Sequence, residues 1–579
     1  MAWYDEAVFY HIYPLGLTGA PTENAYSTPE HRLNTLLPWI SHIKELGCNA
    51  IYIGPLFESV GHGYETTDYK KLDSRLGSNE DLTNFVKKCH AQDIRVILDG
   101  VFNHTGRDFF AFQDIKKNRE NSPYKDWYCN VNFWGNNEYN DGFSYENWGG
   151  YNLLAKLNQQ NPAVKDYICD VIRFWVSEFD IDGIRLDAAD VLNFEYMQAL
   201  RCVANEVKPE FWLMGEVIHG DYNRWVNEGT LHSVTNYHLH KALYSGHNDH
   251  NYFEIAHTVK RLYEMGGNRP EGLKLYNFVD NHDVERIYTK LANKAHFTPV
   301  HILLYTLPGV PSVYYGSEFG IEGKKEKFSD ASLRPALSLS DFANAMTGNP
   351  CTHLLGALGR IRTNTPALSY GDYKELLLTN RQYAFSRNYN GTTVLITVNN
   401  DDSDYVMTLT CGNSREYIGA LSGEKVSVTD GRITVNVMAN SGDIWVPAEN
   451  ETSEIPMPAN RSEKVVVPQA QEVSLCETGP ETEPEDWFFD SAFITNPEPS
   501  QEHAPVQEEA KPLPSDSVTS ADTSVTSDTE AFEQGKIAGL QEAILAIMEK
   551  KGPVTDQMRN DVYRNTHHDS LVNWVKSFY

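Results

Sequence analysis

The sequence predicts an α/β protein whose main domain is a (β/α)8 TIM barrel. Two observations lead to this fold class: short apolar segments recur between residues 7 and 316, and amphipathic helical stretches separate them. Strands that alternate with helices form parallel sheets, and eight such units in one domain predict a closed barrel. The expected strands are 7–13, 49–54, 95–102, 182–188, 211–216, 232–236, 275–280 and 311–316.

Helical periodicity supports the expected crossover helices. Residues 36–47, 79–92 and 163–179 read as helices, and apolar residues recur at helical spacing throughout the last of these. One connection is much longer than the others. Residues 105–150, after the third strand, are rich in Asn, Gly and aromatic residues, and we interpret them as an inserted subdomain.

Shifts in composition divide the chain into four parts. The barrel domain is expected at 1–368, and short alternating strands with Asn-Gly and Asp-Gly turns predict a C-terminal antiparallel β-sandwich domain at 369–447. Residues 448–530 form an acidic segment, in which 451–530 hold 18 Asp and Glu, 3 Lys and Arg, and ten Pro. Such a composition cannot bury a core, so we expect a disordered linker, followed by a short helical tail at 531–579.

The predicted tail carries two apolar stripes on helices that are too short to be stable alone in water. We therefore expect it to bind a surface: a second copy of the chain, a protein partner, or the chain's own barrel. The stripes consist of Ile537, Leu540, Ile544 and Ile547, and of Leu571, Trp574, Val575 and Phe578.

Charge and targeting signals exclude several classes of function. The net charge of −30 argues against nucleic acid and anionic membranes as partners. The N-terminus lacks a basic region followed by an apolar one, and no run of 18 apolar residues exists. The eight cysteines are scattered without a CxxC pair, which is typical of free thiols in a reducing compartment. We expect a cytoplasmic protein.

The segment GIRLDAAD at 183–190 places two charged residues in an apolar strand. Residues two apart in a strand point the same way, so Arg185 and Asp187 share a side, toward the barrel axis. Both lie near the carboxyl end of the strand, where barrel enzymes have their active sites. A purely structural ion pair would explain this segment equally well if it stood alone.

Other strand ends favour an active site. Charged and imidazole side chains follow the third, fifth and seventh strands, and buried charge without a function is costly. Several separate segments therefore deliver such groups to one face of the barrel. They are Asp99, Asn103 and His104 in LDGVFNH, Glu216 after FWLMG, and Asp280, His282 and Asp283 in FVDNHD.

Several carboxyl groups around one small site suggest glycosidic bond cleavage, which uses one carboxylate and one carboxylic acid. Asp187 suits the anion, because Arg185 beside it is expected to lower its pKa. Glu216 suits the acid, because the apolar run before it favours the neutral form. Asp283 is a third carboxylate that can grip sugar hydroxyls.

Four further side chains are candidates for sugar binding. His104 and His282 can donate hydrogen bonds to hydroxyl groups. His62 and Tyr64 belong to GHGYETTDY in the loop after the second strand, and the Tyr64 ring offers a surface for sugar stacking.

These motifs, in this order, resemble the four sequence regions of the α-amylase family, glycoside hydrolase family 13. The segment LAKLN at 154–158 is similar to a fifth region, in the form found in the neopullulanase, cyclomaltodextrinase and maltogenic amylase group. The resemblance covers roughly residues 3–447. The first barrel strand begins by residue 8, so the N-terminal β-domain of that group is expected to be absent.

The resemblance implies a role for each matching position. Asp187 would be the nucleophile, Glu216 the general acid/base and Asp283 the stabiliser of the transition state. The cleavage subsite would be lined by Tyr64, His104, Arg185 and His282. Asn103 falls where many members of the family place a calcium ligand; calcium is left open, and no cofactor is expected to be required.

We therefore expect a retaining hydrolase that cleaves α-1,4-glucosidic bonds of maltodextrins by double displacement. Ala188, after the expected nucleophile, is more typical of α-1,4-acting members than of α-1,6-glucosidases. A transglycosylase would use the same intermediate and is an alternative. A non-catalytic binding or scaffold protein is a third hypothesis, from which loss of catalytic carboxylates would be expected.

Overall fold

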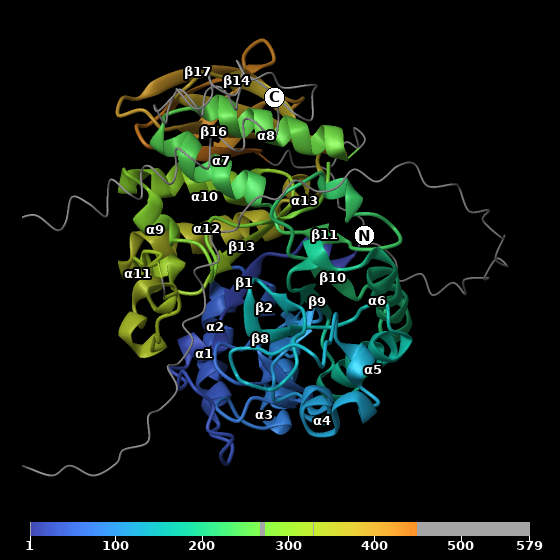
Figure 1. Cartoon of the computed structure of the whole chain (residues 1–579). Helices are drawn as coiled ribbons and strands as arrows, with labels where there is room; N and C mark the ends of the chain where they lie inside the picture. Colours follow the sequence, from blue (N-terminus) through green and yellow to red (C-terminus); the bar gives the residue numbers. More distant parts are fainter. Residues whose placement is uncertain (1, 267–271, 328, 449–579) are drawn as a thin grey trace, which may run out of the picture. The chain divides into compact units, whose positions relative to one another are not determined.

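A closed barrel of eight parallel strands forms the centre of the computed structural model, which describes residues 2–266, 272–327 and 329–448 (Figure 1). Its strands follow the order β11-β10-β9-β5-β2-β1-β13-β12, and a parallel bridge between Thr235 and Tyr276 joins the two ends of this order. The predicted fold class is confirmed. The strands are β1 (Phe9–Ile12), β2 (Ala50–Ile53), β5 (Arg95–Gly100), β9 (Gly183–Leu186), β10 (Trp212–Gly215), β11 (Ser233–Val234), β12 (Tyr276–Asn277) and β13 (Val310–Tyr314).

Helices connect most consecutive barrel strands. The longest, α5, begins after Asn161, whose side chain accepts a hydrogen bond from the Ala163 N–H, and it ends at Asp180 in the left-handed conformation. Between β10 and β11 there is only a 3-10 turn, Tyr222–Arg224. The main helices are α2 (Leu37–Glu45), α3 (Asn79–His90), α5 (Pro162–Phe179), α6 (Phe194–Val207), α7 (Tyr237–Asn248), α8 (Tyr252–Met265), α10 (Phe297–Thr306) and α12 (Pro350–Asn364), with shorter ones at α1 (Pro14–Leu17), α9 (Ile287–Lys290), α11 (Ala345–Gly348) and α13 (Pro366–Tyr370).

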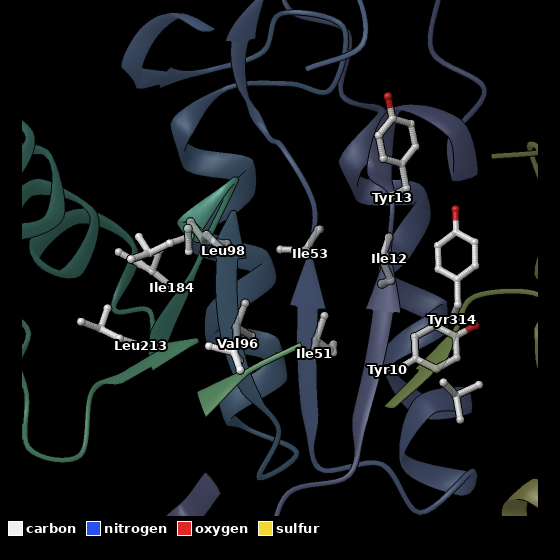
Figure 2. Close-up of a cluster of buried hydrophobic side chains, with 14 of the residues drawn as sticks. Tyr10, Ile12, Tyr13, Ile51, Ile53, Val96, Leu98, Ile184, Leu213 and Tyr314 are labelled. Atoms are coloured by element: carbon white, nitrogen blue, oxygen red, sulfur yellow. The ribbon is translucent and has the colours of Figure 1, made fainter. Parts of the chain in front are cut away.

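Alternation along the strands separates two hydrophobic clusters and sets the direction of the polar residues. The larger cluster includes Tyr10, Ile12, Ile51, Ile53, Val96, Leu98, Ile184 and Leu213, several of which Figure 2 shows on neighbouring strands, and it also contains the buried faces of the helices. The smaller cluster contains Phe9, Ala50, Tyr52, Ile97, Trp212 and Met214, the residues of opposite parity. It therefore fills the barrel interior. Four polar residues lie at alternate positions that also point into the barrel. They are Asp99 in β5, Arg185 in β9, Asp187 just after β9 and Glu216 just after β10.

The connection from β5 to α5 contains the inserted segment. A short antiparallel sheet of order β6-β8-β7 holds it against the end of the barrel, with His104 paired to Lys156. The other small sheet pairs β3 with β4 in the connection after β2. These elements are β3 (Phe57–Ser59), β4 (Thr66–Leu72), β6 (His104–Thr105), α4 (Phe110–Asn118), β7 (Asn147–Trp148) and β8 (Tyr151–Lys156).

The described chain ends in a small β-domain, and the expected antiparallel arrangement is confirmed. Six strands form one sheet and two form another, with a separate core that includes Leu395, Met407, Ile433 and Trp445. The predicted linker and helical tail lie outside the described residues except for residue 448. The strands are β14 (Lys374–Leu378), β15 (Gln382–Tyr389), β16 (Thr392–Asn399), β17 (Tyr405–Thr410), β18 (Glu416–Gly419), β19 (Lys425–Ser427), β20 (Arg432–Val437) and β21 (Ser441–Pro447).

Among the helices in the described ranges, none has the length and apolar character needed to cross a bilayer.

Asp182, just before β9, lies at the amino ends of the barrel strands, opposite the candidate site, and connects several segments there. Its carboxylate contacts the His90 Nε2 at 2.7 Å, the Arg95 Nη1 at 3.0 Å, the Val96 N–H at 2.9 Å and the Lys208 Nζ at 3.0 Å. Burial alone raises the pKa of this carboxyl, but the His90 and Val96 hydrogen bonds and the charge of Lys208 lower it to about 2.

Asp182→Asn is expected to lower the free energy of unfolding by about 2 kcal/mol at pH 7. The folded pKa lies below the unfolded value of about 3.9, so this stability is present above pH ~4 and is lost as the pH falls toward 2. Urea unfolding of both proteins from pH 7 to pH 3 measures it. A difference that stays constant down to pH 3 would contradict the assignment.

Candidate active site

Arg185 lies at the centre of three carboxyl groups at the carboxyl end of the barrel strands. Its Nη1 is 2.9 Å from Asp99 Oδ1 and 2.9 Å from Asp187 Oδ1, and its Nη2 is 3.0 Å from Glu216 Oε2. We call Asp99, Asp187 and Glu216 the carboxyl cluster. Arg185, Asp99 and Asp187 are buried and Glu216 is nearly so. One guanidinium cannot balance three carboxylates in a buried place, and the effect is seen at Asp187, whose pKa is raised.

The backbone turn after β9 positions two residues of the site, Asp187 and Ala188. Asp187 donates its N–H to the Gly100 carbonyl at 3.0 Å, which continues the parallel pairing with β5. Ala188 has a φ of +45°, in the left-handed region that a residue with a Cβ rarely adopts. This turn directs the Ala188 N–H to Glu216 Oε2 at 3.0 Å. Two neighbouring strands are thus joined through the carboxyl group of Glu216.

The protonation of Asp187 differs from the sequence-based expectation. Burial raises the pKa of Asp187 well above its usual range; Arg185 opposes this, whereas the charges of Glu216 and Asp99 add to it. Arg185 lowers this pKa as predicted, but the expected net direction is wrong, because burial outweighs the guanidinium. The raised pKa of Asp187 therefore comes first from burial, and Arg185 offsets it only in part.

Asp283 occupies a different electrostatic environment. Its Oδ1 is 2.8 Å from the Arg334 Nη2, its Oδ2 is 3.0 Å from the His282 Nε2, and its backbone carbonyl accepts a hydrogen bond from Lys325. Burial alone raises the pKa of Asp283, but its interactions with His282 and Arg334 lower it well below the usual range. Asp283 is therefore ionised at neutral pH.

Tyr64 links these two groups of charges. Its hydroxyl lies 3.3 Å from Asp99 Oδ2 and also contacts the His282 Nε2. The Tyr64 ring is nearly parallel to the His282 ring at 5.8 Å between centroids, and Tyr13 is placed similarly with respect to His282. A continuous chain of contacts thus runs from Glu216 to Asp283.

His62 and His104 complete the set of predicted residues. The His62 ring lies 5.7 Å from that of Tyr64, and its Nδ1 is 3.4 Å from the Tyr64 N–H. Burial, and then the charge of His62, lowers the pKa of His104 to about 3, and burial also lowers that of His62. Both imidazoles are neutral at neutral pH. The structure thus brings together all eight predicted residues: His62, Tyr64, His104, Arg185, Asp187, Glu216, His282 and Asp283.

A cleft of about 790 Å³ lies beside the carboxyl cluster rather than on it. The inserted segment lines one side, with Tyr128 and Phe133, and the loops after β9 and β10 line the other, with Asp190, Phe194 and Arg224. Burial, and then the charge of Glu216, raises the pKa of Asp190 to about 6. Asp190, three residues after Asp187, is thus the cleft residue that the charge of Glu216 reaches, and the volume of the cleft lies in the range of ligand-binding clefts.

Sequence reasoning missed three residues that contact or line this site. Tyr13 follows the strand-end rule and could have been selected by it. Asp190 comes three residues after Asp187 and has no pattern of its own. Arg334 comes from the long connection after β13, where no periodicity or motif points to the site.

Asn103, where the resemblance left a calcium ligand open, has its side-chain oxygen engaged by another residue. Its side-chain oxygen already accepts a hydrogen bond from the Gln159 Nε2 at 3.0 Å, and it is fully buried. Within the described ranges, no three His, Cys, Asp or Glu residues are arranged to hold a metal ion.

Comparison with known proteins agrees with the motifs. Residues 33–348 match the family described as "Alpha amylase, catalytic domain", and residues 371–445 match "Alpha-amylase C-terminal domain". A cyclomaltodextrinase from a Bacillus species is 30% identical over 450 residues, which are 74% of this chain and 78% of that protein.

Solved structures give the same result. A cyclomaltodextrinase is similar with a TM-score of 0.67 and 25% identity, over 76% of this chain and 78% of that one. An α-amylase from Anoxybacillus has a TM-score of 0.65 and 25% identity, over 78% of this chain and 100% of that one. The chain belongs to the α-amylase family and is a glycoside hydrolase, so the predicted resemblance is confirmed.

Proposed function

We propose that the protein is a retaining hydrolase of α-1,4-glucosidic bonds in maltodextrins and related α-glucans. The observation that carries the proposal is the shared guanidinium of Arg185, which contacts both Asp187 and Glu216. Two carboxyl groups held this closely suit the separation of about 5–5.5 Å that a covalent glycosyl-enzyme route requires. The names of the relatives supply the substrate class.

Each carboxyl has a separate part in the proposed reaction. Asp187 attacks the anomeric carbon while Glu216 donates a proton to the glycosidic oxygen, so the leaving sugar departs with its hydroxyl restored. Glu216 then removes a proton from water, whose oxygen attacks the same carbon and releases Asp187. Asp283, ionised beside Arg334, binds sugar hydroxyls and stabilises the distorted ring. His62, Tyr64, His104 and His282 bind the sugar at the cleavage point.

Transglycosylation by the same intermediate is a second candidate, because a sugar hydroxyl can replace water in the second step, and the cleft near the carboxyl cluster offers room for an acceptor sugar. A non-catalytic scaffold is disfavoured, since all three carboxylates are present and in contact with the partners that catalysis needs. Cytoplasmic location and association through residues 531–579 stay predictions.

Products from four substrates test the proposal. The protein is expected to cleave maltotriose and cyclodextrins, to leave isomaltose intact, and to degrade pullulan only at its α-1,4 bonds. Chromatography with mass detection identifies the products, and Asp187→Asn serves as the inactive control. Sugars longer than maltotriose at high substrate concentration would favour the transglycosylase. A protein that releases no sugar from maltotriose, cyclodextrin or pullulan would refute the proposed activity.

A further inference from the structure

A chain of hydrogen bonds leads to the His104 ring, and it begins at a group that can act only as a donor. The backbone N–H of Asn193 lies 2.7 Å from the Gln159 Oε1. A backbone N–H can only donate, so this end of the Gln159 amide must be the oxygen. The other end is then the NH2 group, which donates to the Asn103 side-chain oxygen at 3.0 Å.

The same logic passes to the next amide. Because Asn103 presents its oxygen to Gln159, its NH2 group faces the other way and lies 3.3 Å from the His104 Nδ1. An NH2 group has no acceptor lone pair available to a ring N–H, so Nδ1 must be the unprotonated nitrogen. A neutral imidazole has one N–H, and it is then on Nε2.

We infer that Gln159 and Asn103 are positioning residues that fix His104 in the tautomer with its proton on Nε2, so that this atom donates a hydrogen bond to the bound sugar. The inference deepens the proposed function and rests on it for the identity of the acceptor. Gln159 and Asn103 are both buried, and within the described ranges the His104 Nε2 has no hydrogen-bond partner of its own.

Gln159 also joins three parts of the chain at this point. It follows β8, whereas Asn103 follows β5 and Asn193 immediately precedes α6. One buried amide therefore connects the exit of the inserted segment to two barrel loops, at the position where the family resemblance implied a calcium ligand.

The Tyr64 backbone carbonyl competes with the Asn103 amide in deciding which nitrogen of the His104 ring carries the proton. It favours a proton on the imidazole, and if that proton were on Nδ1 the Nε2 would become an acceptor. The two arrangements differ in which ring nitrogen carries the proton. Nitrogen NMR reads this directly, because protonated and unprotonated ring nitrogens have well separated 15N shifts.

The experiment is long-range 1H–15N NMR on the full chain labelled with 15N-histidine, without substrate at pH 7. His104 is assigned as the signal missing from the His104→Gln spectrum. The expected result is a protonated Nε2 and an unprotonated Nδ1. A proton on Nδ1 in the native protein would overturn the inference and identify the Tyr64 carbonyl as the group that orients the ring.

Asn103→Asp tests the relay without changing its shape. The carboxylate still accepts from Gln159, but it now also accepts from His104, so the Nδ1 is expected to become protonated. A neutral ring with its proton on Nδ1 has no Nε2–H to donate to the sugar. The value of kcat/KM for maltotriose is therefore expected to fall about 10–100-fold. The matched control is Asn205→Asp on the exposed face of α6, where either side chain accepts from Arg201.

Gln159→Leu covers the case in which Asn103→Asp does not fold. It frees the Asn103 amide to rotate, and a mixture of the two tautomers is expected. An unchanged Nε2–H tautomer in Gln159→Leu would overturn the part assigned to Gln159. The tautomer is measured without substrate, so a protein that cleaves no glucan would refute the proposed function and leave the NMR result standing.

Discussion

Asp187→Asn is expected to lower the rate of maltotriose hydrolysis by about 10⁴-fold or more, and Glu216→Gln by about 10²–10⁴-fold. Asp187 forms the covalent bond of the intermediate in the proposed reaction, and an amide oxygen is a poor nucleophile. Glu216 supplies and removes the proton that each half-reaction needs. Initial rates from reducing-sugar release measure both effects.

A substrate that needs no acid separates the two roles. Fluoride leaves α-maltosyl fluoride without a proton, so Glu216→Gln is expected to keep a burst of fluoride release from the first step. Asp187→Asn is expected to lose that burst. Equal loss of the burst in both variants, with folding confirmed by circular dichroism, would remove the division of labour between these residues.

Arg185→Met is expected to have the largest effect on stability. It removes the cation that contacts all three members of the carboxyl cluster, and it leaves their charges buried without compensation. Breaking a buried ion pair in this way costs about 3–5 kcal/mol. Urea unfolding at pH 7 measures the loss, and activity is expected to disappear with it because the carboxyl groups are no longer held in place.

The dependence of this loss on pH has a fixed sign. Without Arg185, Asp187 loses the cation that lowers its already raised pKa, so protonation of Asp187 relieves the repulsion at low pH. The destabilisation is therefore expected to be larger at pH 8 than at pH 5. Adding Asp99→Asn to Arg185→Met should restore part of the stability. If Arg185→Met is as stable as the native protein at pH 8, the Arg185 guanidinium does not stabilise the buried carboxylates.

The direction of the key side chains could be predicted from the sequence, because strand alternation decides it. Arg185 and Asp187 are two residues apart in GIRLDAAD, and the structure places both on the interior side with Asp99 and Glu216. Parallel strands end on the same face of a barrel, so groups from separate segments meet there. The positions of these residues along their strands were therefore enough to predict that their side chains meet.

The balance of charges could not be predicted in the same way. The pKa of Asp187 depends on how many carboxylates share Arg185 and on how deeply they are buried, and neither follows from a local segment. Arg334 comes from an irregular connection whose path is set by tertiary packing. Gln159 directly follows the LAKLN segment, but its importance is visible only in the contacts with Asn193 and Asn103.

The stereochemistry of the first product tests the central claim most directly. Proton NMR during rapid cleavage of 4-nitrophenyl α-maltoside identifies the anomer of the maltose that is released before it mutarotates. Double displacement through Asp187 inverts the anomeric carbon twice, so α-maltose is expected to appear first. The appearance of β-maltose first would mean a single displacement by water and would contradict the assignment of Asp187 as the nucleophile.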